Sequence, residues 1–244
     1  MQQVISDLQS VQIEKIIENE PLSNHTTWKI GGPADLMIFP EDKKQLVDTV
    51  RILYRHGIPW TVVGRGSNML VSDKGIRGAV IKLGKPLEFV RFEQERVISG
   101  GSYSFIKLSV MAGKAGLTGL EFAGGIPGTV GGAVYMNAGA HGSDVSRILK
   151  QAEVVLETGE LVTYQVEDLH YAYRHSLLQE QKGIVTEASF QLQFGDRKEI
   201  AAAMAAYKDR RLKTQPMQMA CAGSVFRNPD HHFAAQLIEN AGLK

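Results

Sequence analysis

A chain of 244 residues, at roughly 150 residues per domain, predicts one or two compact units. Its 43% hydrophobic and 22% charged residues exclude a disordered chain, and its formal net charge of +1 argues against a dedicated nucleic-acid binder, which needs a concentrated basic face. The single cysteine, Cys221, excludes an intramolecular disulfide framework, and no apolar run approaches the roughly 20 residues of a membrane span.

The first 23 residues predict an amphipathic helix packed on a domain. Apolar residues recur at helical spacing from Val4 to Ile17. Acidic residues interrupt this stretch, so it lacks the apolar core of an export signal. The expectation is therefore a soluble, cytoplasmic protein.

Strands and helices alternate after Pro21. Apolar runs predict strands over 35–40, 60–63, 79–83, 89–99 and 184–194, and a hairpin of strands 151–157 and 160–165 around Thr158-Gly159. Helical spacing predicts helices over 41–56, 102–115, 198–212 and 233–240, with Gly57 ending the first and Pro216 the third. The mixture predicts an α+β fold.

The first of two glycine-rich segments is Gly64-Arg65-Gly66-Ser67-Asn68, directly after a predicted strand. Two glycines allow positive φ and let consecutive N–H groups form a nest for an anion, to which Ser67 and Asn68 add donors. The same residue types also form ordinary tight turns, so the spacing leaves phosphate binding and a simple turn both open.

The second segment, residues 124–132, has five glycines in nine residues and Pro127 at one bend. This density is costly in chain entropy unless something approaches the backbone closely, which favours a flat ligand or its pyrophosphate over a structural hinge. Neither segment matches the Rossmann or P-loop glycine pattern. A nucleotide site here would be built from two separated loops that converge on one cleft.

Two polar segments further along carry candidate catalytic residues. Arg174 lies among aromatic residues and can bind a carboxylate or an enolate oxygen, although a lone arginine is more commonly a surface residue. Ser224 has no Gly-x-Ser-x-Gly context, so it is a candidate proton donor or the cap of a following helix. No metal site is expected, because His175, His231 and His232 lack partners at metal-ligand spacing.

Taken in chain order, five segments resemble the UDP-N-acetylenolpyruvoylglucosamine reductase family in its shorter (type II) form. The segments are Asn24-His25-Thr26-Thr27-Trp28-Lys29-Ile30-Gly31-Gly32-Pro33-Ala34, Gly64 to Asn68, Gly125 to Gly132, Tyr173 to Ser176 and Ala222 to Pro229. Several blocks in the right order are more specific than any one of them, and the resemblance runs from Asn24 to Lys244.

The resemblance implies two FAD-binding subdomains of the vanillyl-alcohol-oxidase (PCMH) type, over 24–86 and 87–195, after a helix over 1–23. Residues 196–244 would begin an α+β substrate domain that is incomplete here. FAD would be non-covalent, since Ser67 follows Gly66, and its pyrophosphate would lie on the first loop and its rings along the second. The implied FAD-binding residues are Gly64, Arg65, Gly66, Ser67, Asn68, Gly124, Gly125, Ile126, Pro127, Gly128, Thr129, Gly131, Gly132 and Ala133.

The implied activity is reduction of UDP-N-acetylglucosamine enolpyruvate to UDP-N-acetylmuramate in peptidoglycan synthesis, with NADPH reducing the flavin. Arg174 matches the family arginine that stabilises the negative charge developing on the substrate. Ser224 matches the serine that protonates the resulting carbon. Arg227 and Asn228 match positions that contact the nucleotide-phosphate part of this UDP-sugar; no nucleic acid or membrane partner is implied.

The family continues past the position of Lys244, and that stretch carries a glutamate that partners the arginine. No residue here matches it, so the resemblance implies a chain lacking one catalytic group and part of the substrate lid. Two alternatives stay open: a flavin oxidase of the same fold, and a catalytically incomplete FAD-binding fragment.

Overall fold

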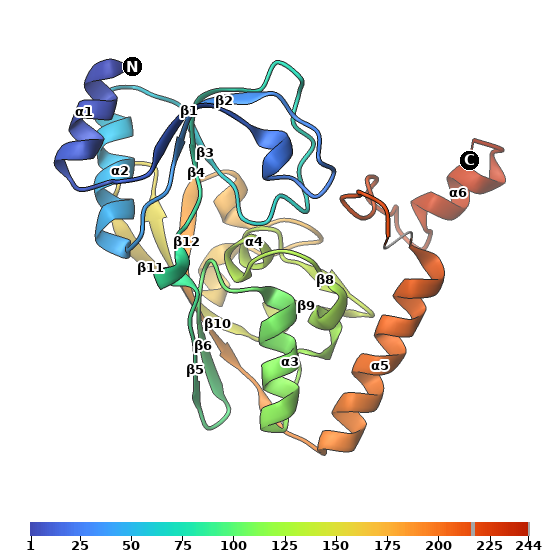
Figure 1. The fold of residues 1–244 in the computed structure, drawn as a ribbon. Coiled ribbons are helices and arrows are strands. Elements are labelled where there is room, and N and C mark those ends of the chain that lie inside the picture. The colour runs from blue at the N-terminus through green and yellow to red at the C-terminus, as the bar shows by residue number, and fades with distance from the viewer. Residues whose placement is uncertain (216–217, 244) are drawn as a thin grey trace.

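Two β-sheets with separate apolar cores form the body of the protein, as a computed structural model shows (Figure 1). The structure describes residues 1–215 and 218–243. None of the helices among these residues is long and apolar enough to span a membrane.

The first sheet has the strand order β1-β2-β4-β3. Its strands are β1 (Ile16–Pro21), β2 (Pro33–Ile38), β3 (Trp60–Val62) and β4 (Ile76–Ile81). Strands β2, β4 and β3 run parallel, so their carboxyl ends meet at one edge, the edge where open α/β sheets bind ligands. Helices α1 (Gln2–Ser10) and α2 (Lys43–Arg55) pack together beside this sheet (Figure 1).

The N-terminal helix is shorter than the sequence predicts. It ends at Ser10, and Ile16 and Ile17 lie in β1, which pairs antiparallel with β2. The chain leaves the helix through Gln12 at a φ of 64°, and the pairing with β2 then satisfies the backbone of β1. Strand pairing thus overrides an apolar spacing that also suits a helix.

The second sheet is antiparallel throughout, in the order β11-β10-β12-β6-β5. Its strands are β5 (Val90–Glu93), β6 (Arg96–Gly100), β10 (Leu149–Leu156), β11 (Leu161–Gln165) and β12 (Gly183–Gln191). The single strand predicted over 89–99 is wrong, because Gln94 at a φ of 56° reverses the chain and makes β5 and β6 a hairpin. The predicted β10–β11 hairpin is confirmed.

Short elements between β6 and β10 cover one face of the second sheet. These are α3 (Phe105–Ala115), the short helical turn η3 (Glu121–Gly125), α4 (Val130–Tyr135) and the paired strands β8 (Gly139–Ala140) and β9 (Ser143–Asp144). The strands β7 (Leu117–Thr118) and β13 (Gln193–Phe194) also pair. Helix α3 matches its prediction: the Ser104 side chain accepts from Lys107 N at its start, and Gly116 ends it in the left-handed region.

The last fifth of the chain forms an arm beside the body (Figure 1). Helix α5 (Arg197–Thr214) lies along α3 and η3 and buries Ile200, and α6 (Ala234–Asn240) follows it. Most of the described side chains beyond α5 are exposed, including Phe226 and Phe233 at 64% and 61%. Both helices agree with the sequence, although Pro216, predicted as the stop of α5, lies outside the described residues, as does Lys244.

Candidate functional site

A large cleft lies between the two sheets, with a volume of about 1440 Å³. Both glycine segments line it, and so do residues of the arm. This volume exceeds the roughly 300–1,000 Å³ of a pocket for one drug-sized ligand. The cleft therefore has room for a dinucleotide and a second ligand together.

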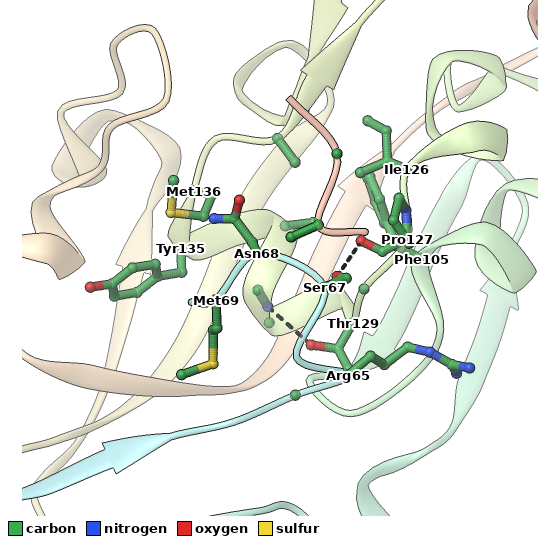
Figure 2. Close-up of a pocket in the computed structure, with 18 of the residues that line it drawn as sticks. Arg65, Ser67, Asn68, Met69, Phe105, Ile126, Pro127, Thr129, Tyr135 and Met136 are labelled. Atoms are coloured by element: carbon green, nitrogen blue, oxygen red, sulfur yellow. Dashed lines mark hydrogen bonds between the residues drawn. The ribbon is translucent and has the colours of Figure 1, made fainter. Parts of the chain in front are cut away.

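The two glycine loops meet across this cleft, although sixty residues separate them in sequence (Figure 2). Ser67 Oγ donates a hydrogen bond to the Pro127 carbonyl at 2.8 Å. Gly64 lies so close to Thr129 that an added Cβ would come within 2.8 Å of the threonine Oγ1. The prediction that separated loops converge on one cleft is confirmed.

The first loop offers unused backbone donors. Among the residues that the structure describes, the backbone N–H groups of residues 64–68 have no acceptor. The loop is fixed instead through the Gly66 carbonyl, which accepts from Thr27 N at 3.1 Å. Gly66 has a φ of +63°, and a Cβ there would lie 2.1 Å from the His25 carbonyl oxygen. A glycine-dependent turn with free N–H groups fits an anionic group such as a diphosphate.

Most backbone donors of the second loop are occupied. Val130 N and Gly131 N each donate at 2.8 Å, to the Tyr103 and Gly101 carbonyls, and Thr129 Oγ1 caps α4 by accepting from Gly132 N at 3.2 Å (Figure 2). The start of α4 is therefore satisfied within the protein. This loop therefore contributes mainly a wall of backbone and small side chains to the cleft. Among the described residues, only its Gly128 and Thr129 N–H groups lack an acceptor.

The structure corrects the expected extent of the second loop. Ile126, Pro127, Gly128, Thr129, Gly131, Gly132 and Ala133 line the cleft, but Gly124 and Gly125 lie in η3, outside the cleft wall. These two glycines face α5: Cβ atoms there would contact Met204 Cε at 3.4 Å and Arg211 Cδ at 3.2 Å. A helix, and not a ligand, is what approaches this part of the backbone.

Arg174 lines the cleft from a tight turn in which Ala172 and His175 exchange backbone hydrogen bonds. Its Nη2 donates to the Gly139 carbonyl at 2.6 Å, and its guanidinium lies 4.9 Å from the centre of the Tyr173 ring. Its φ is 57°, in the left-handed region that costs a non-glycine residue roughly 1–2 kcal/mol. Strain of this kind, held by surrounding contacts, is typical of functional positions.

Ser224 and Asn228 line the same cleft from the arm, while Arg227 does not. Asn228 Oδ1 accepts from Ala234 N at 3.0 Å, and Arg227 Nη2 reaches the Arg174 carbonyl at 3.4 Å. The alternative that Ser224 caps a helix is wrong, because α6 begins after Phe233. Ser224 is exposed on the arm and its hydroxyl can serve a ligand in the cleft.

Several charged side chains on the cleft wall were not predicted as site residues. They include Lys82, His141, Arg210 and Arg211. The sequence predicts the two arginines only as the end of a helix, because the residue spacing of α5 does not reveal which side of the helix faces the body. Lys82 follows β4 as the first glycine loop follows β3, and this shared position at the carboxyl edge is the signal that sequence reasoning missed.

Arginines of α5 shape the electrostatics at this side of the cleft. The His141 ring stacks on Tyr207 with centroids 3.9 Å apart. Burial, helped by Arg210 and Arg211, holds the pKa of His141 below its ordinary value, and burial also lowers the pKa of Arg211. This wall is therefore rich in cationic groups, which disfavour the protonated form of His141.

Comparison with known families agrees with this geometry. The FAD binding domain family matches residues 34–165, and the C-terminal domain family of UDP-N-acetylenolpyruvoylglucosamine reductase matches residues 215–244. Berberine bridge enzyme from Eschscholzia californica, 14% identical, has a TM-score of 0.61 over 80% of this chain and 44% of that one. That likeness concerns the fold alone. The prediction of an α+β, PCMH-type FAD-binding fold is confirmed.

Relatives of higher identity match the whole chain. UDP-N-acetylenolpyruvoylglucosamine reductases of Bacillus licheniformis and Bacillus subtilis are 51% and 49% identical over all of this chain and 81% of their own length. The crystal structure of UDP-N-acetylenolpyruvylglucosamine reductase from Thermus caldophilus is 34% identical, with a TM-score of 0.82 over 94% of this chain and 81% of that one. Identity at this level shows that the chain belongs to the UDP-N-acetylenolpyruvoylglucosamine reductase family.

Proposed function

We propose that this protein uses FAD and NADPH to reduce the enolpyruvyl ether of UDP-N-acetylglucosamine enolpyruvate to UDP-N-acetylmuramate, in the cytoplasmic stage of peptidoglycan synthesis. The observation that carries the proposal is the meeting of two glycine loops, Arg174 and Ser224 in one cleft. The names of the relatives supply the substrate and the reaction.

The two loops have different roles in holding FAD without a covalent bond. The unused N–H groups of residues 64–68 suit the diphosphate, and the backbone wall of residues 126–133 suits the flat ring system. In this proposal residues 24–86 and 87–195 hold FAD between them, and residues 196–244 contribute to the substrate side. The helix and strand of residues 1–23 pack with the first unit.

The substrate gains one hydride and one proton across its carbon–carbon double bond. FAD, when bound and reduced by NADPH, supplies the hydride to the β-carbon. Arg174 stabilises the negative charge that then develops toward the substrate carboxylate, since its guanidinium is already oriented by Gly139 and Tyr173. Ser224 Oγ donates the proton to the α-carbon as the new C–H bond forms.

Arg227 and Asn228 orient the nucleotide-phosphate part of the substrate in this scheme. Asn228 lines the cleft and keeps its amide N–H₂ group for a ligand, because its Oδ1 is used by Ala234 N. Arg227 contributes through its contact with the Arg174 carbonyl, which joins the arm to the catalytic turn.

Anaerobic stopped-flow measurement of the two half-reactions tests the proposal. NADPH should bleach the flavin absorbance of the FAD-loaded protein, and UDP-N-acetylglucosamine enolpyruvate should restore it. The steady state should then consume one NADPH per substrate, with no oxygen uptake.

Other outcomes identify the alternatives. Flavin reoxidation by oxygen that is indifferent to the enolpyruvyl sugar would indicate an oxidase. Tight FAD binding without reduction by NADPH would indicate a non-catalytic FAD-binding chain. Either result would overturn the proposed reduction.

A further inference from the structure

The segment Asn24 to Thr27 has no part in the function proposed above, yet one of its side chains reaches the cleft wall. His25 Nδ1 lies 3.0 Å from Lys82 Nζ, and His25 Nε2 lies 2.9 Å from Glu20 Oε1. An ammonium group only donates hydrogen bonds, so His25 accepts from protonated Lys82 and donates to Glu20 through Nε2–H. Glu20, His25 and Lys82 therefore form one hydrogen-bonded chain.

This chain is built into the body. The Glu20 and His25 side chains are only 18% and 13% exposed, and the His25 ring packs against Phe39 at 6.2 Å between centroids. Hydrogen bonding from His25 holds the pKa of Glu20 below its ordinary value. The carboxylate thus stays charged and fixes the imidazole, which in turn fixes the direction of the Lys82 ammonium group.

Lys82 is a half-buried cation that lacks a direct counter-charge. Within residues 1–215 and 218–243, no carboxylate lies within ion-pair distance of its Nζ. Burial is the largest cause that lowers the pKa of Lys82, and the charges of Lys15 and Arg65 lower it further. The more distant Glu20 carboxylate raises this pKa, by a smaller amount. Arg65 lines the same cleft, so two cations share this part of the wall. An anion bound between them would offset the cost of burying the Lys82 charge and the repulsion between the two cations.

The position of Lys82 points to the same ligand as the first glycine loop. Val63 N donates to the Ile81 carbonyl at 2.9 Å, which sets Lys82 beside the start of that loop. The His25 backbone lies directly beneath Gly66. The ammonium group and the unused N–H groups therefore belong to one corner of the cleft.

We infer that Lys82, oriented by His25 and Glu20, binds the diphosphate of FAD together with residues 64–68, an assignment that rests on the proposed use of FAD. Lys82 touches the ligand in this assignment. His25 and Glu20 are positioning residues that hold Lys82 in place. Any diphosphate shares this chemistry, so the test must separate FAD from NADPH and the UDP-sugar.

Flavin fluorescence titrations of the apoprotein test the assignment. Lys82→Met should weaken FAD binding roughly 10- to 100-fold, the size of a lost charge-assisted hydrogen bond, and flatten the dependence of Kd on salt. Riboflavin, which lacks the diphosphate, should bind both proteins equally. Lys15→Met is the matched control, since Lys15 is close to Lys82 but does not line the cleft; its FAD affinity should match wild type.

Variants of His25 separate positioning from packing. His25→Phe keeps a ring against Phe39 but removes the acceptor for Lys82, and should weaken FAD binding several-fold. His25→Gln, which can still accept from Lys82 and donate to Glu20, should recover most of that loss. If His25→Gln restored thermal stability but recovered neither the FAD affinity nor its salt dependence, the positioning role would be contradicted.

The outcomes for the assignment and for the proposed reduction are distinct. Unchanged FAD affinity in Lys82→Met, or equal weakening of FAD and riboflavin, would overturn the assignment and leave the reduction standing. A rise confined to the KM for NADPH or for the UDP-sugar would also overturn it. If the wild-type protein bound FAD through Lys82 but did not reduce the UDP-sugar, only the proposed function would be overturned.

Discussion

The two sides of the cleft rest on very different supports. On the body side, the first glycine loop and Lys82 follow strands of the first sheet, and the second loop leads into α4; all three adjoin buried apolar clusters. On the arm side, Ser224 and Asn228 sit on exposed chain, and Ile200 is the buried residue of α5. Under the proposed function, this difference predicts that the body binds the cofactor and that the substrate step depends on the arm.

Hydrogen bonds of the Thr27 and Arg227 side chains join residues 218–243 of the arm to the body. Thr27 Oγ1 donates to the Cys221 carbonyl at 2.6 Å, and Arg227 reaches the Arg174 carbonyl. Segments with few buried contacts open at low free-energy cost. Substitutions in the body should therefore affect FAD affinity, and substitutions in the arm should affect turnover at unchanged FAD affinity.

The largest effect is expected for Gly66→Ala. A Cβ there would lie 2.1 Å from the His25 carbonyl oxygen, so the loop, His25 and the diphosphate site must all shift. We expect a loss of roughly 3 kcal/mol or more in unfolding free energy and the loss of bound flavin at micromolar FAD. Denaturant unfolding and flavin absorbance of the purified protein measure both.

Gly57→Ala is the matched control for that change. Gly57 has nearly the same φ, +62°, but its Cβ would meet open space. The Gly57→Ala protein should lose only about 1 kcal/mol of unfolding free energy, which is the cost of an alanine in the left-handed region, and should keep its bound flavin. Equal losses in the two variants would show that backbone strain alone, and not the contact with His25, governs the first loop.

The next largest effect concerns the arm. Ser224→Ala should slow flavin reoxidation by substrate roughly 10²- to 10⁴-fold, the range for a lost general acid. Flavin reduction by NADPH and the Kd for FAD should stay at wild-type values, because Ser224 lies on the arm. If both half-reactions slowed together, the proton-donor role would be wrong and the functional division between body and arm would be weakened.

Local patterns predicted most elements but not the ones that depend on distant partners. The helix over 102–115 carries its own cap and stop in Ser104 and Gly116, so its limits can be read locally. Strand β1 exists because β2 pairs with it, and its apolar residues fit a helix equally well. A periodicity argument cannot choose between these structures without knowing the partner.

The site residues likewise divide into those that local sequence predicts and those that only distant contacts bring together. The loop over 64–68 was identifiable, because glycine density reports close backbone approach wherever the partner comes from. That density could not tell a ligand from a helix, so Gly124 and Gly125 were assigned to the cofactor although α5 packs there. Lys82 and His141 have unremarkable sequence neighbours, and only the fold brings them to the cleft.

A smaller effect should follow from loosening the arm at its anchor. Thr27→Val removes the donor to the Cys221 carbonyl, a hydrogen bond worth about 0.5–1.5 kcal/mol. We expect kcat/KM for the UDP-sugar to fall several-fold while the Kd for FAD is retained. Thr26→Val is the control: it breaks a bond within the body, from Thr26 Oγ1 to the Ile30 carbonyl at 2.9 Å. A matching fall in kcat/KM for Thr26→Val would show that the anchor is not specific.

The smallest effect is a pH dependence where α5 meets the body. His141 stacks on Tyr207, and its pKa is lowered in the fold, so the unfolded chain binds this proton more readily. The stabilisation is therefore complete above the ordinary histidine pKa of about 6.5 and is lost as pH falls through the lower, folded value. His141→Phe keeps an aromatic ring on Tyr207 without the titration. Between about pH 8 and about pH 5, the Tm of the wild type should fall by about 1 °C more than that of His141→Phe. Parallel Tm profiles would mean that the helix docks independently of this imidazole, leaving apolar packing around Ile200 as the contact that holds it.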